Sequence, residues 1–170
     1  MEPILTINPE QVTKIEAEGY VLRNAARGVV FDAEGKIALL NVTKYGYHKL
    51  PGGGIDAGET HEEALMRECS EEIGCGVTVG APLGEIVEYR KLLSLVQHSF
   101  CFMADVVGEK GEPHMEQGEI DDGFKVEWHN LDNALLIMQR EIPQNYEGQY
   151  IVARDMRYLI AAHKIINQSV

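Results

Sequence analysis

Short apolar runs alternate with polar, glycine-containing segments along most of this chain, a pattern typical of strands joined by turns. Runs rich in aliphatic and aromatic residues predict strands at residues 22–31, 37–43, 82–90, 95–107 and 124–128. Between the first two runs, the segment from Asp32 to Gly35 predicts a tight turn. Residues 44–59, rich in Gly and Pro, and residues 108–122, rich in acids, are predicted to be loops.

The clearest helix signal in the sequence begins at Thr60. Thr60 and Glu63 have the spacing of a capping box and Gly74 is a typical C-terminal stop, so a helix is predicted over residues 61–73. The residues that recur every four positions along it form an apolar stripe, which we expect to face the core: Leu65, Cys69 and Ile73.

Three further helices are predicted. Near the start of the chain, Asn8 as N-cap and Pro9 as first helical residue favour a short helix that ends near Gly19, although the alternation in this segment also allows a strand. A second helix opens at Leu131, and a third covers residues 146–166. An apolar stripe on the third helix would pack on its own domain or mediate dimerisation, and it contains Val152, Met156, Leu159, His163 and Ile166.

Strands and helices interleave along the chain, so the predicted fold class is α/β or α+β with a mixed sheet. A length of 170 residues fits one domain over 1–170, with an N-terminal extension at 1–21 and a C-terminal helix at 146–167. The content of 45% apolar and 25% charged residues excludes disordered and fibrous proteins.

The cysteines and the N-terminal residues predict a cytoplasmic protein. The chain has three cysteines, an odd number with no CxxC pair, which favours reduced and buried thiols over a disulfide framework. The first residues have neither a basic segment nor a long apolar run of the signal-peptide kind, and no apolar stretch is as long as a membrane span.

The formal net charge of −12 excludes broad binding to nucleic-acid polymers or anionic membranes, because like charges repel. Residues 53–75 hold seven acids and one base, and residues 109–127 hold seven acids and two bases. These two segments therefore contain nearly all of the excess negative charge of the chain. A charge that served only solubility would be spread more evenly. If the substrate is an anion, a cation must mediate its binding.

Three glutamates share one edge of the predicted helix over residues 61–73. Glu68, Glu71 and Glu72 stand at i, i+3 and i+4, where like charges destabilise a helix by roughly 0.2–0.5 kcal/mol per pair. One interpretation is a solvated acidic face. The other is a site for a hard divalent cation, which prefers several oxygen ligands. The glycine run at residues 52–54, just before the helix, favours the second because it lets backbone approach a ligand closely.

The spacing of Gly53, Glu59 and the segment Arg67-Glu68-Cys69-Ser70-Glu71-Glu72-Ile73-Gly74-Cys75 resembles the Nudix box in full. The family pattern is Gly, five of any residue, Glu, seven of any, then Arg-Glu-apolar-any-Glu-Glu-any-Gly-apolar. Two cysteines fill the apolar positions, where aliphatic residues are commoner, and buried cysteine behaves as a small hydrophobe. On this motif the chain is identified as a member of the Nudix hydrolase family, of the MutT-like kind.

The resemblance implies an α/β/α sandwich around a mixed sheet and hydrolysis of a phosphoanhydride bond with Mg²⁺ or Mn²⁺ as cofactor. The substrate would be a nucleoside diphosphate linked to another group, cleaved by attack of water on phosphorus. By the same resemblance, Glu68, Glu71 and Glu72 are expected to bind metal, with Gly53 lending its carbonyl. Glu68 and Glu71 are also expected to be catalytic, Glu68 as general base, while Glu59 and Arg67 support the site.

A further acid from outside the box is expected, and the second acidic segment is its natural source. Glu119 is the preferred candidate because it lies just before the strand that ends near Trp128; Glu116, Asp121 and Asp122 are alternatives. The phosphates of the substrate are expected to meet basic residues on the neighbouring strands and loop: Arg27, Lys49 and Arg90, with Lys44 as a further candidate.

Several functions share this motif. A nucleoside triphosphate is the leading substrate class, since the chain is short, and the alternatives are ADP-ribose or a nucleotide sugar, or a dinucleoside polyphosphate. An alternative of another kind is a module that binds a nucleotide without hydrolysing it, which the intact set of box glutamates disfavours. We expect a monomer or homodimer whose partner is a small nucleotide.

Overall fold

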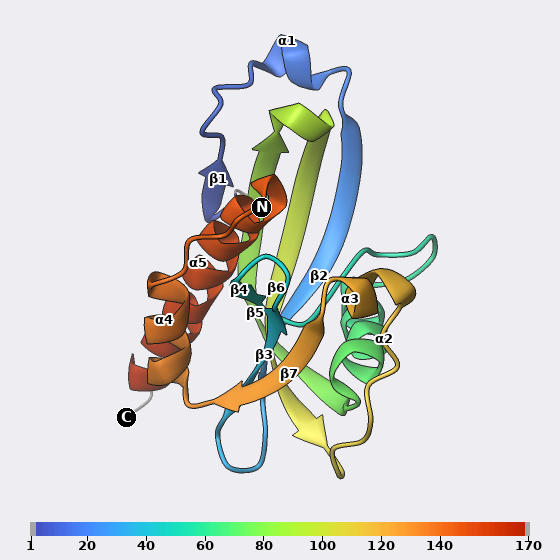
Figure 1. Cartoon of the computed structure of the whole chain (residues 1–170), viewed down its shortest axis with the longest axis vertical. Coiled ribbons are helices and arrows are strands. Elements are labelled where there is room, and N and C mark those ends of the chain that lie inside the picture. Colours follow the sequence, from blue (N-terminus) through green and yellow to red (C-terminus); the bar gives the residue numbers. More distant parts are fainter. Residues whose placement is uncertain (1–2, 169–170) are drawn as a thin grey trace.

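The computed structural model describes residues 3–168, which form a mixed sheet with helices on both faces (Figure 1). The strands are β1 (Leu5–Ile7), β2 (Val21–Phe31), β3 (Ile37–Val42), β4 (Tyr47–Lys49), β5 (Gly76–Arg90), β6 (Leu95–Val107) and β7 (Phe124–His129). The helices are α1 (Lys14–Ala17), α2 (His61–Ile73), α3 (Gln117–Asp121), α4 (Leu131–Gln139) and α5 (Tyr146–Gln168), with a 3₁₀ turn η1 (Lys91–Leu93).

The seven strands form one sheet in the order β1-β5-β6-β2-β3-β4, and β7 pairs with β3. The pairs β1–β5 and β2–β6 are parallel, whereas β5–β6, β3–β4 and β3–β7 are antiparallel. This combination confirms the predicted mixed sheet.

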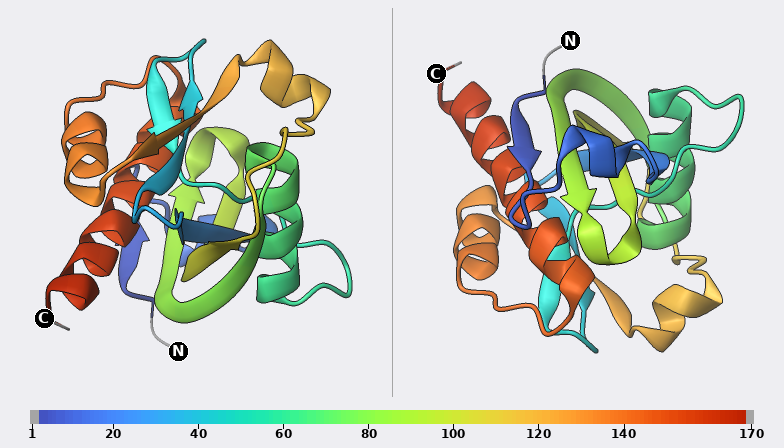
Figure 2. Two further views of the ribbon diagram at one scale, coloured as in Figure 1. Left: turned by 90° about the horizontal axis from the view of Figure 1, so that it is seen from below. Right: turned by 90° about the horizontal axis from the view of Figure 1, so that it is seen from above.

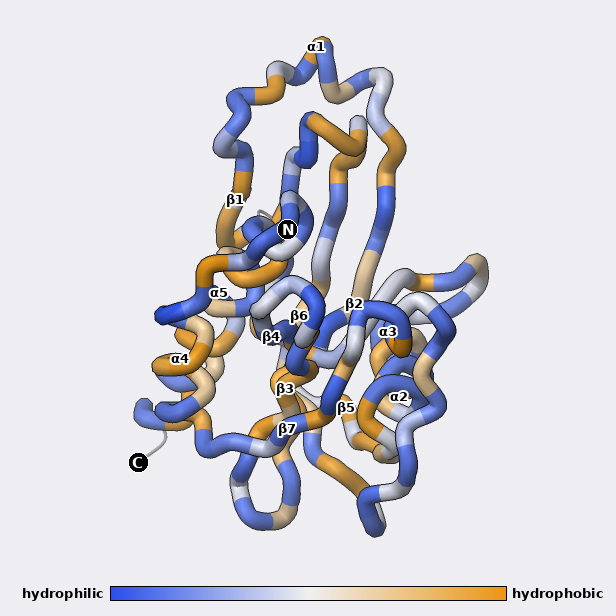
Figure 3. The backbone as a smooth tube through the Cα atoms, in the orientation of Figure 1, coloured by the Kyte–Doolittle hydropathy of each residue, from blue (hydrophilic) through white to orange (hydrophobic). Residues whose placement is uncertain are grey.

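Two hydrophobic cores lie on opposite faces of the sheet. One packs α2, through Leu65 and Cys69, against strand residues such as Leu40. The other packs α4 and α5 against Leu39 and its neighbours on the opposite face. Figure 2 shows the resulting three layers, with α2 on one side of the sheet and α4 and α5 on the other. Figure 3 shows that β3, between the two cores, is almost wholly hydrophobic, as expected for a strand covered on both faces.

Helix α2 begins and ends where the sequence predicts. The Thr60 hydroxyl accepts a hydrogen bond from the Glu63 amide, and the Glu63 carboxylate accepts one from the Thr60 amide in return. Gly74 ends the helix in the left-handed conformation, at φ 64°. A Cβ at Gly74 would also lie 2.5 Å from the Gly111 carbonyl oxygen. Local signals therefore determine both ends of the helix that bears the box glutamates.

The N-terminal helix was predicted at the wrong place. Asn8 does not cap a helix there: its side chain bonds both the amide and the carbonyl of Val12. The helix starts only after Thr13, whose capping box with Glu16 is a stronger local signal. The segment between Asn8 and Val12 is a turn, and the residues before it form β1 at the edge of the sheet.

Two segments predicted as loops contain regular structure. The loop after residue 44 includes β4, which is short and is held by pairing with β3. The acidic loop contains α3, a single helical turn just before Gly123. Both elements are too short for hydrophobic periodicity to reveal. Strand β5 also begins at Gly76, six residues before the predicted start, and irregular register around Pro82 accounts for the interrupted pattern.

The buried side of α5 differs from the predicted stripe. Leu159 is buried, whereas Val152, Met156, His163 and Ile166 are only partly buried, although Val152 and Met156 still pack against the core. The side that faces the sheet instead contains a mixture of aromatic, small and charged residues: Tyr150, Arg154, Asp155, Tyr158 and Ala162.

The three cysteines are free and buried, as the sequence predicts. Among residues 3–168, no helix has both the length and the apolar character needed to cross a membrane.

Candidate active site

A polar cavity of about 230 Å³ opens between the N-terminal loop of α2 and the end of the sheet. Its acidic wall consists of Glu68, Glu71 and Glu72 from α2, together with Glu116 and Glu119 from the α3 segment. Its basic wall consists of Arg23, Arg27, Arg90 and Arg154, with Gln97 among them. The structure thus brings together acids and bases from segments far apart in the sequence.

Glu72 is the most deeply buried member of the acidic wall, at 1% exposure. Its two carboxylate oxygens have separate partners: Lys49 Nζ at 2.7 Å and the Gly52 amide at 2.6 Å. Gly52 has φ 128°, and a Cβ there would lie 2.1 Å from the Ala26 carbonyl oxygen. Glycine is therefore required for the loop to reach the glutamate.

Arg67 joins the other carboxylates of the box. Its guanidinium donates two hydrogen bonds to Glu59, at 2.8 and 3.0 Å, and others to Glu68 at 2.8 Å and Glu71 at 3.3 Å. It also donates to the Gly54 carbonyl at 2.9 Å, which ties the glycine loop to the helix. The hydrogen bonds from Arg67 lower the pKa of Glu59 to about 2. Arg67 thus connects Glu59, the glycine loop and two glutamates of the helix.

Glu68 lies against Gly53, where an added Cβ would be 2.3 Å from its Oε1 atom. Burial and the charge of Glu72 raise the pKa of Glu68, despite the hydrogen bond from Arg67. The Gly53 carbonyl oxygen accepts a hydrogen bond from the Ala26 amide at 3.0 Å and retains a second lone pair. The close packing explains why glycine occupies this position of the box.

Glu119 faces the box glutamates from α3. Its carboxylate accepts the Glu116 amide at 2.8 Å, which fixes its orientation. Burial, together with the charge of Glu72, raises the pKa of Glu119 to about 7. The structure therefore places Glu119, the preferred candidate from the second acidic segment, in the cavity. Glu116 also lines the cavity, whereas Asp122 pairs with Lys44 at the surface and Asp121 bonds Gln117.

The basic wall contains buried guanidinium groups whose hydrogen-bonding capacity is only partly used. Arg27 and Arg154 are 5% and 0% exposed. Nε and Nη1 of Arg27, and both Nη atoms of Arg154, have no hydrogen-bond partner in the protein. Burial and the charge of Arg154 lower the pKa of Arg27 to about 10, so both groups remain cationic at neutral pH. Buried donors of this kind are normally paired, so they suggest an absent anionic partner.

The remaining predicted phosphate-binding residues differ in their surroundings. Lys49 is in the cavity, but its ammonium group is engaged by Glu72. Arg90 is buried, donates to Glu88 and to Glu147, and lies against the ring of Tyr150. Lys44 does not line the cavity.

Sequence reasoning missed Arg154, which reaches the cavity from α5. Asp155 at 2.7 Å and Glu88 at 3.6 Å flank its guanidinium. A signal was present: Arg154 recurs at four-residue spacing with Tyr150, Tyr158 and Ala162, so it is the charged member of a stripe that is otherwise aromatic or apolar. Arg23 and Gln97, which bond each other at 3.4 Å, were also missed because neither belongs to a motif.

A family model for the NUDIX domain matches residues 21–149, well over half of the chain and all of the box. The chain belongs to the Nudix family. The matched range extends from the start of β2 to the first turn of α5, and so includes both acidic segments and most of the basic wall.

Two curated relatives of this Nudix protein cover part of its length. It is 39% identical over 84 residues to an 8-oxo-dGTP diphosphatase from Haemophilus influenzae, an alignment that covers 49% of this chain and 57% of the relative. It is 38% identical over 72 residues to an RNA pyrophosphohydrolase from Erythrobacter litoralis, covering 42% of this chain and 38% of the relative. The alignments thus span less than two thirds of either relative.

Solved structures share the fold at low sequence identity. A NUDIX hydrolase from Nitrosomonas europaea has a TM-score of 0.62 at 16% identity, with 85% of this chain and 90% of that chain covered. The Ap4A hydrolase from C. elegans has a TM-score of 0.60 at 17% identity, with 86% and 99% covered. These likenesses confirm the predicted Nudix-type fold.

Proposed function

We propose that this protein is a divalent-metal-dependent hydrolase that cleaves a phosphoanhydride bond of a nucleotide by attack of water on phosphorus. The observation that supports this most directly is the opposition of the two walls within one cavity. The acidic wall suits a hard cation, and the guanidinium N–H groups without a hydrogen-bond partner suit phosphate oxygens. A purely solvated acidic face would need neither buried glutamates nor buried arginines.

The carboxylates fit Mg²⁺ or Mn²⁺ by their chemistry. Glu68, Glu71 and Glu72 offer only oxygen atoms, and the pKa of Glu68 is raised in part by the charge of Glu72, so a cation between them would relieve the repulsion. When bound there, the cation would polarise the phosphate oxygens and neutralise developing charge.

The protein's own groups would perform the remaining steps. Arg27 and Arg154 would bind the phosphate oxygens of the substrate through their free N–H groups. A carboxylate would accept the proton of the attacking water: Glu68, the general base that the family resemblance implies, or Glu119, whose carboxylate faces the box from the other side of the cavity. Water forms the new bond to phosphorus, and the anhydride bond to the leaving phosphate breaks. Lys49 and Gly52 would hold Glu72 in place.

A nucleoside triphosphate is the substrate class that we favour, because one relative of the matched segment is named an 8-oxo-dGTP diphosphatase. Other neighbours are named for Ap4A, ADP-ribose and UDP-X. These names point to dinucleoside polyphosphates and to nucleotides with a second group as the alternatives. The intact box disfavours a module that only binds.

The test is phosphate and nucleotide release from a panel of 8-oxo-dGTP, dGTP, diadenosine tetraphosphate, ADP-ribose and UDP-glucose, with Mg²⁺ or Mn²⁺. Glu71→Gln is a better probe than a change at Glu72, because the Glu71 side chain is 39% exposed whereas Glu72 is buried and paired with Lys49. We expect turnover of one substrate class and a loss of at least about 100-fold in Glu71→Gln, since charge stabilisation by a metal contributes several kcal/mol.

The matched control is Glu62→Gln, an exposed glutamate on the same helix that does not line the cavity. It should retain full activity. Equal activity of Glu71→Gln and wild type would refute the metal site. Metal-dependent nucleotide binding without turnover would favour the binding module.

A further inference from the structure

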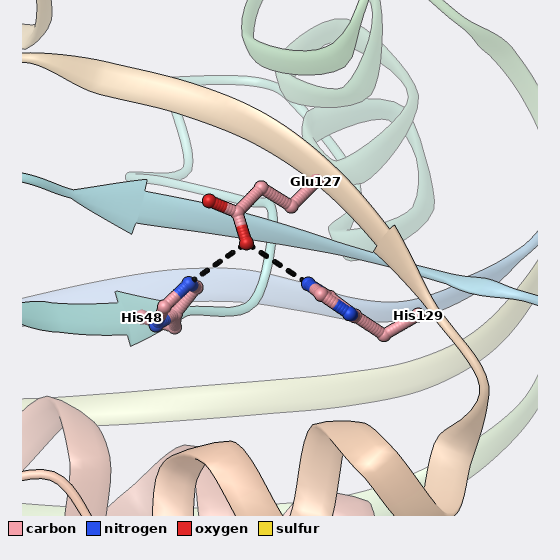
Figure 4. Close-up of side chains that lie close together, drawn as sticks. All are labelled: His48, Glu127 and His129. Atoms are coloured by element: carbon pink, nitrogen blue, oxygen red, sulfur yellow. Dashed lines mark hydrogen bonds and ion pairs between the residues drawn. The ribbon is translucent and has the colours of Figure 1, made fainter.

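A second cluster of metal-ligating side chains lies on the opposite face of the sheet from α2. His48 of β4 and Glu127 and His129 of β7 converge there, with the potential ligand atoms all within 4.8 Å of one another (Figure 4). In the antiparallel register, Glu127 is opposite Leu39 and His129 is opposite Ile37. Paired residues point to the same face, and Leu39 and Ile37 belong to the core under α4 and α5.

Two of the three spacings between the ligand atoms are already close to those of a tetrahedral site. His48 Nε2 lies 3.2 Å and His129 Nε2 lies 2.9 Å from the same oxygen, Oε2 of Glu127. Bonds of about 2.0–2.1 Å from Zn²⁺ to nitrogen and oxygen imply ligand–ligand separations of roughly 3.3 Å. A cation between these atoms therefore requires only small side-chain shifts.

The side chains that bond to the candidate ligands are arranged as they are around known metal sites. Nδ1 of His48 contacts the carboxylate of Glu141, which is 10% exposed, and Glu127 Oε1 accepts a hydrogen bond from Asn41 at 2.8 Å. The second carboxylate oxygen of Glu141 is buried without a hydrogen-bond partner. A carboxylate behind a metal-binding imidazole fixes its tautomer and orientation, and such partners are typical of zinc sites.

The charges of this cluster suit a cation. Among residues 3–168, neither Glu127 nor Glu141 forms an ion pair with Lys or Arg. His48 faces a carboxylate at each ring nitrogen, and a neutral imidazole can donate to only one of them, so satisfying both requires a second proton on the ring or a bound cation. With a cation present, Nδ1–H donates to Glu141 while the lone pair of Nε2 points to the metal.

We propose that His48, Glu127 and His129 form a second cation site, for a divalent transition metal of the Zn²⁺ type. Imidazole nitrogen with carboxylate suits Zn²⁺, Co²⁺ and Ni²⁺, whereas the all-oxygen box suits Mg²⁺ or Mn²⁺. Three protein ligands leave one coordination position open. The ligand side chains are 13%, 33% and 24% exposed, so a cation can enter from solvent.

The site is tested by Zn²⁺ binding to the full chain in equilibrium dialysis, with excess Mg²⁺ to occupy the box. Co²⁺ provides a second readout, because its visible absorption reports nitrogen ligation and coordination number. We expect wild type to bind Zn²⁺, and His129→Ala to weaken binding more than tenfold. His163→Ala is the matched control, since His163 is a surface histidine with a single carboxylate partner, Asp132 at 3.2 Å. It should bind as wild type does.

Glu71→Gln separates this site from the box, and it should leave Zn²⁺ affinity unchanged. Glu141→Gln keeps the side-chain shape and should weaken binding about 10–100-fold, the usual cost of losing an outer partner. If His129→Ala does not fold, Glu141→Gln serves as the test in its place. Absence of Zn²⁺ binding by wild type, equal affinity in His129→Ala or Glu141→Gln, or loss in Glu71→Gln alone would each overturn the proposal. None of these readouts depends on hydrolysis.

Discussion

The two walls of the active-site cavity are organised in opposite ways. On the acidic wall, each box glutamate already has a partner in the protein: Lys49 and Gly52 for Glu72, and Arg67 for Glu68 and Glu71. On the basic wall, Arg27 and Arg154 retain buried N–H groups without a partner. The fold therefore holds the acidic wall in place, whereas the basic wall keeps donor groups that are free to bind an anion.

The largest expected effect is on the acidic wall, from Lys49→Met. This change leaves Glu72 buried with no cationic partner, so we expect the free energy of unfolding to fall by about 3–5 kcal/mol. Urea denaturation measures this loss. The control is Lys44→Met, which removes an exposed pair with Asp122 and should change stability by less than about 1 kcal/mol. Equal, small effects of the two changes would mean that the Lys49–Glu72 pair does not organise the wall.

The second prediction concerns the basic wall, where Arg27→Met should behave differently. Removal of a buried charge with unused donors should leave the free energy of unfolding unchanged or raise it, because the desolvation cost disappears. KM for the substrate should rise by about 10–100-fold, because the change removes one charge-assisted hydrogen bond of roughly 1.5–3 kcal/mol. Arg157→Met, an exposed arginine elsewhere on α5, should leave KM unchanged. An unaltered KM in Arg27→Met would remove Arg27 from the substrate site.

The smallest expected effect is the pH dependence of stability that Glu119 contributes. The pKa of Glu119 is about 7 in the folded protein, above the usual value of 4.5, so the folded state binds more protons between these pH values. Stability should therefore decline as the pH rises from about 4.5 to 7, by about 1–2 kcal/mol after allowance for solvent screening. Glu119→Gln should remove that part of the decline, and saturating Mg²⁺ should reduce it in wild type. Identical slopes for wild type and Glu119→Gln would show that Glu119 is not buried against Glu72.

Sequence alone determined the features that depend on local chemistry. The capping box at Thr60 and the stop at Gly74 predicted α2 to the residue, and the apolar runs of β2, β3, β6 and β7 predicted most of the sheet. The spacing of the box placed its glutamates on one helix edge. These signals act within a few residues, so no tertiary information is needed to recognise them.

Only the tertiary structure decided which distant side chains meet. Arg154 reaches the cavity because α5 packs across the sheet, and β4 turns Lys49 toward the box on one face and His48 toward Glu127 on the other. Adjacent residues of a strand point to opposite faces, so a short segment predicted as a loop contributes to two separate polar clusters. Charge and burial at these positions depend on contacts made across the whole chain, whereas the helix and strand patterns depend on neighbours in sequence.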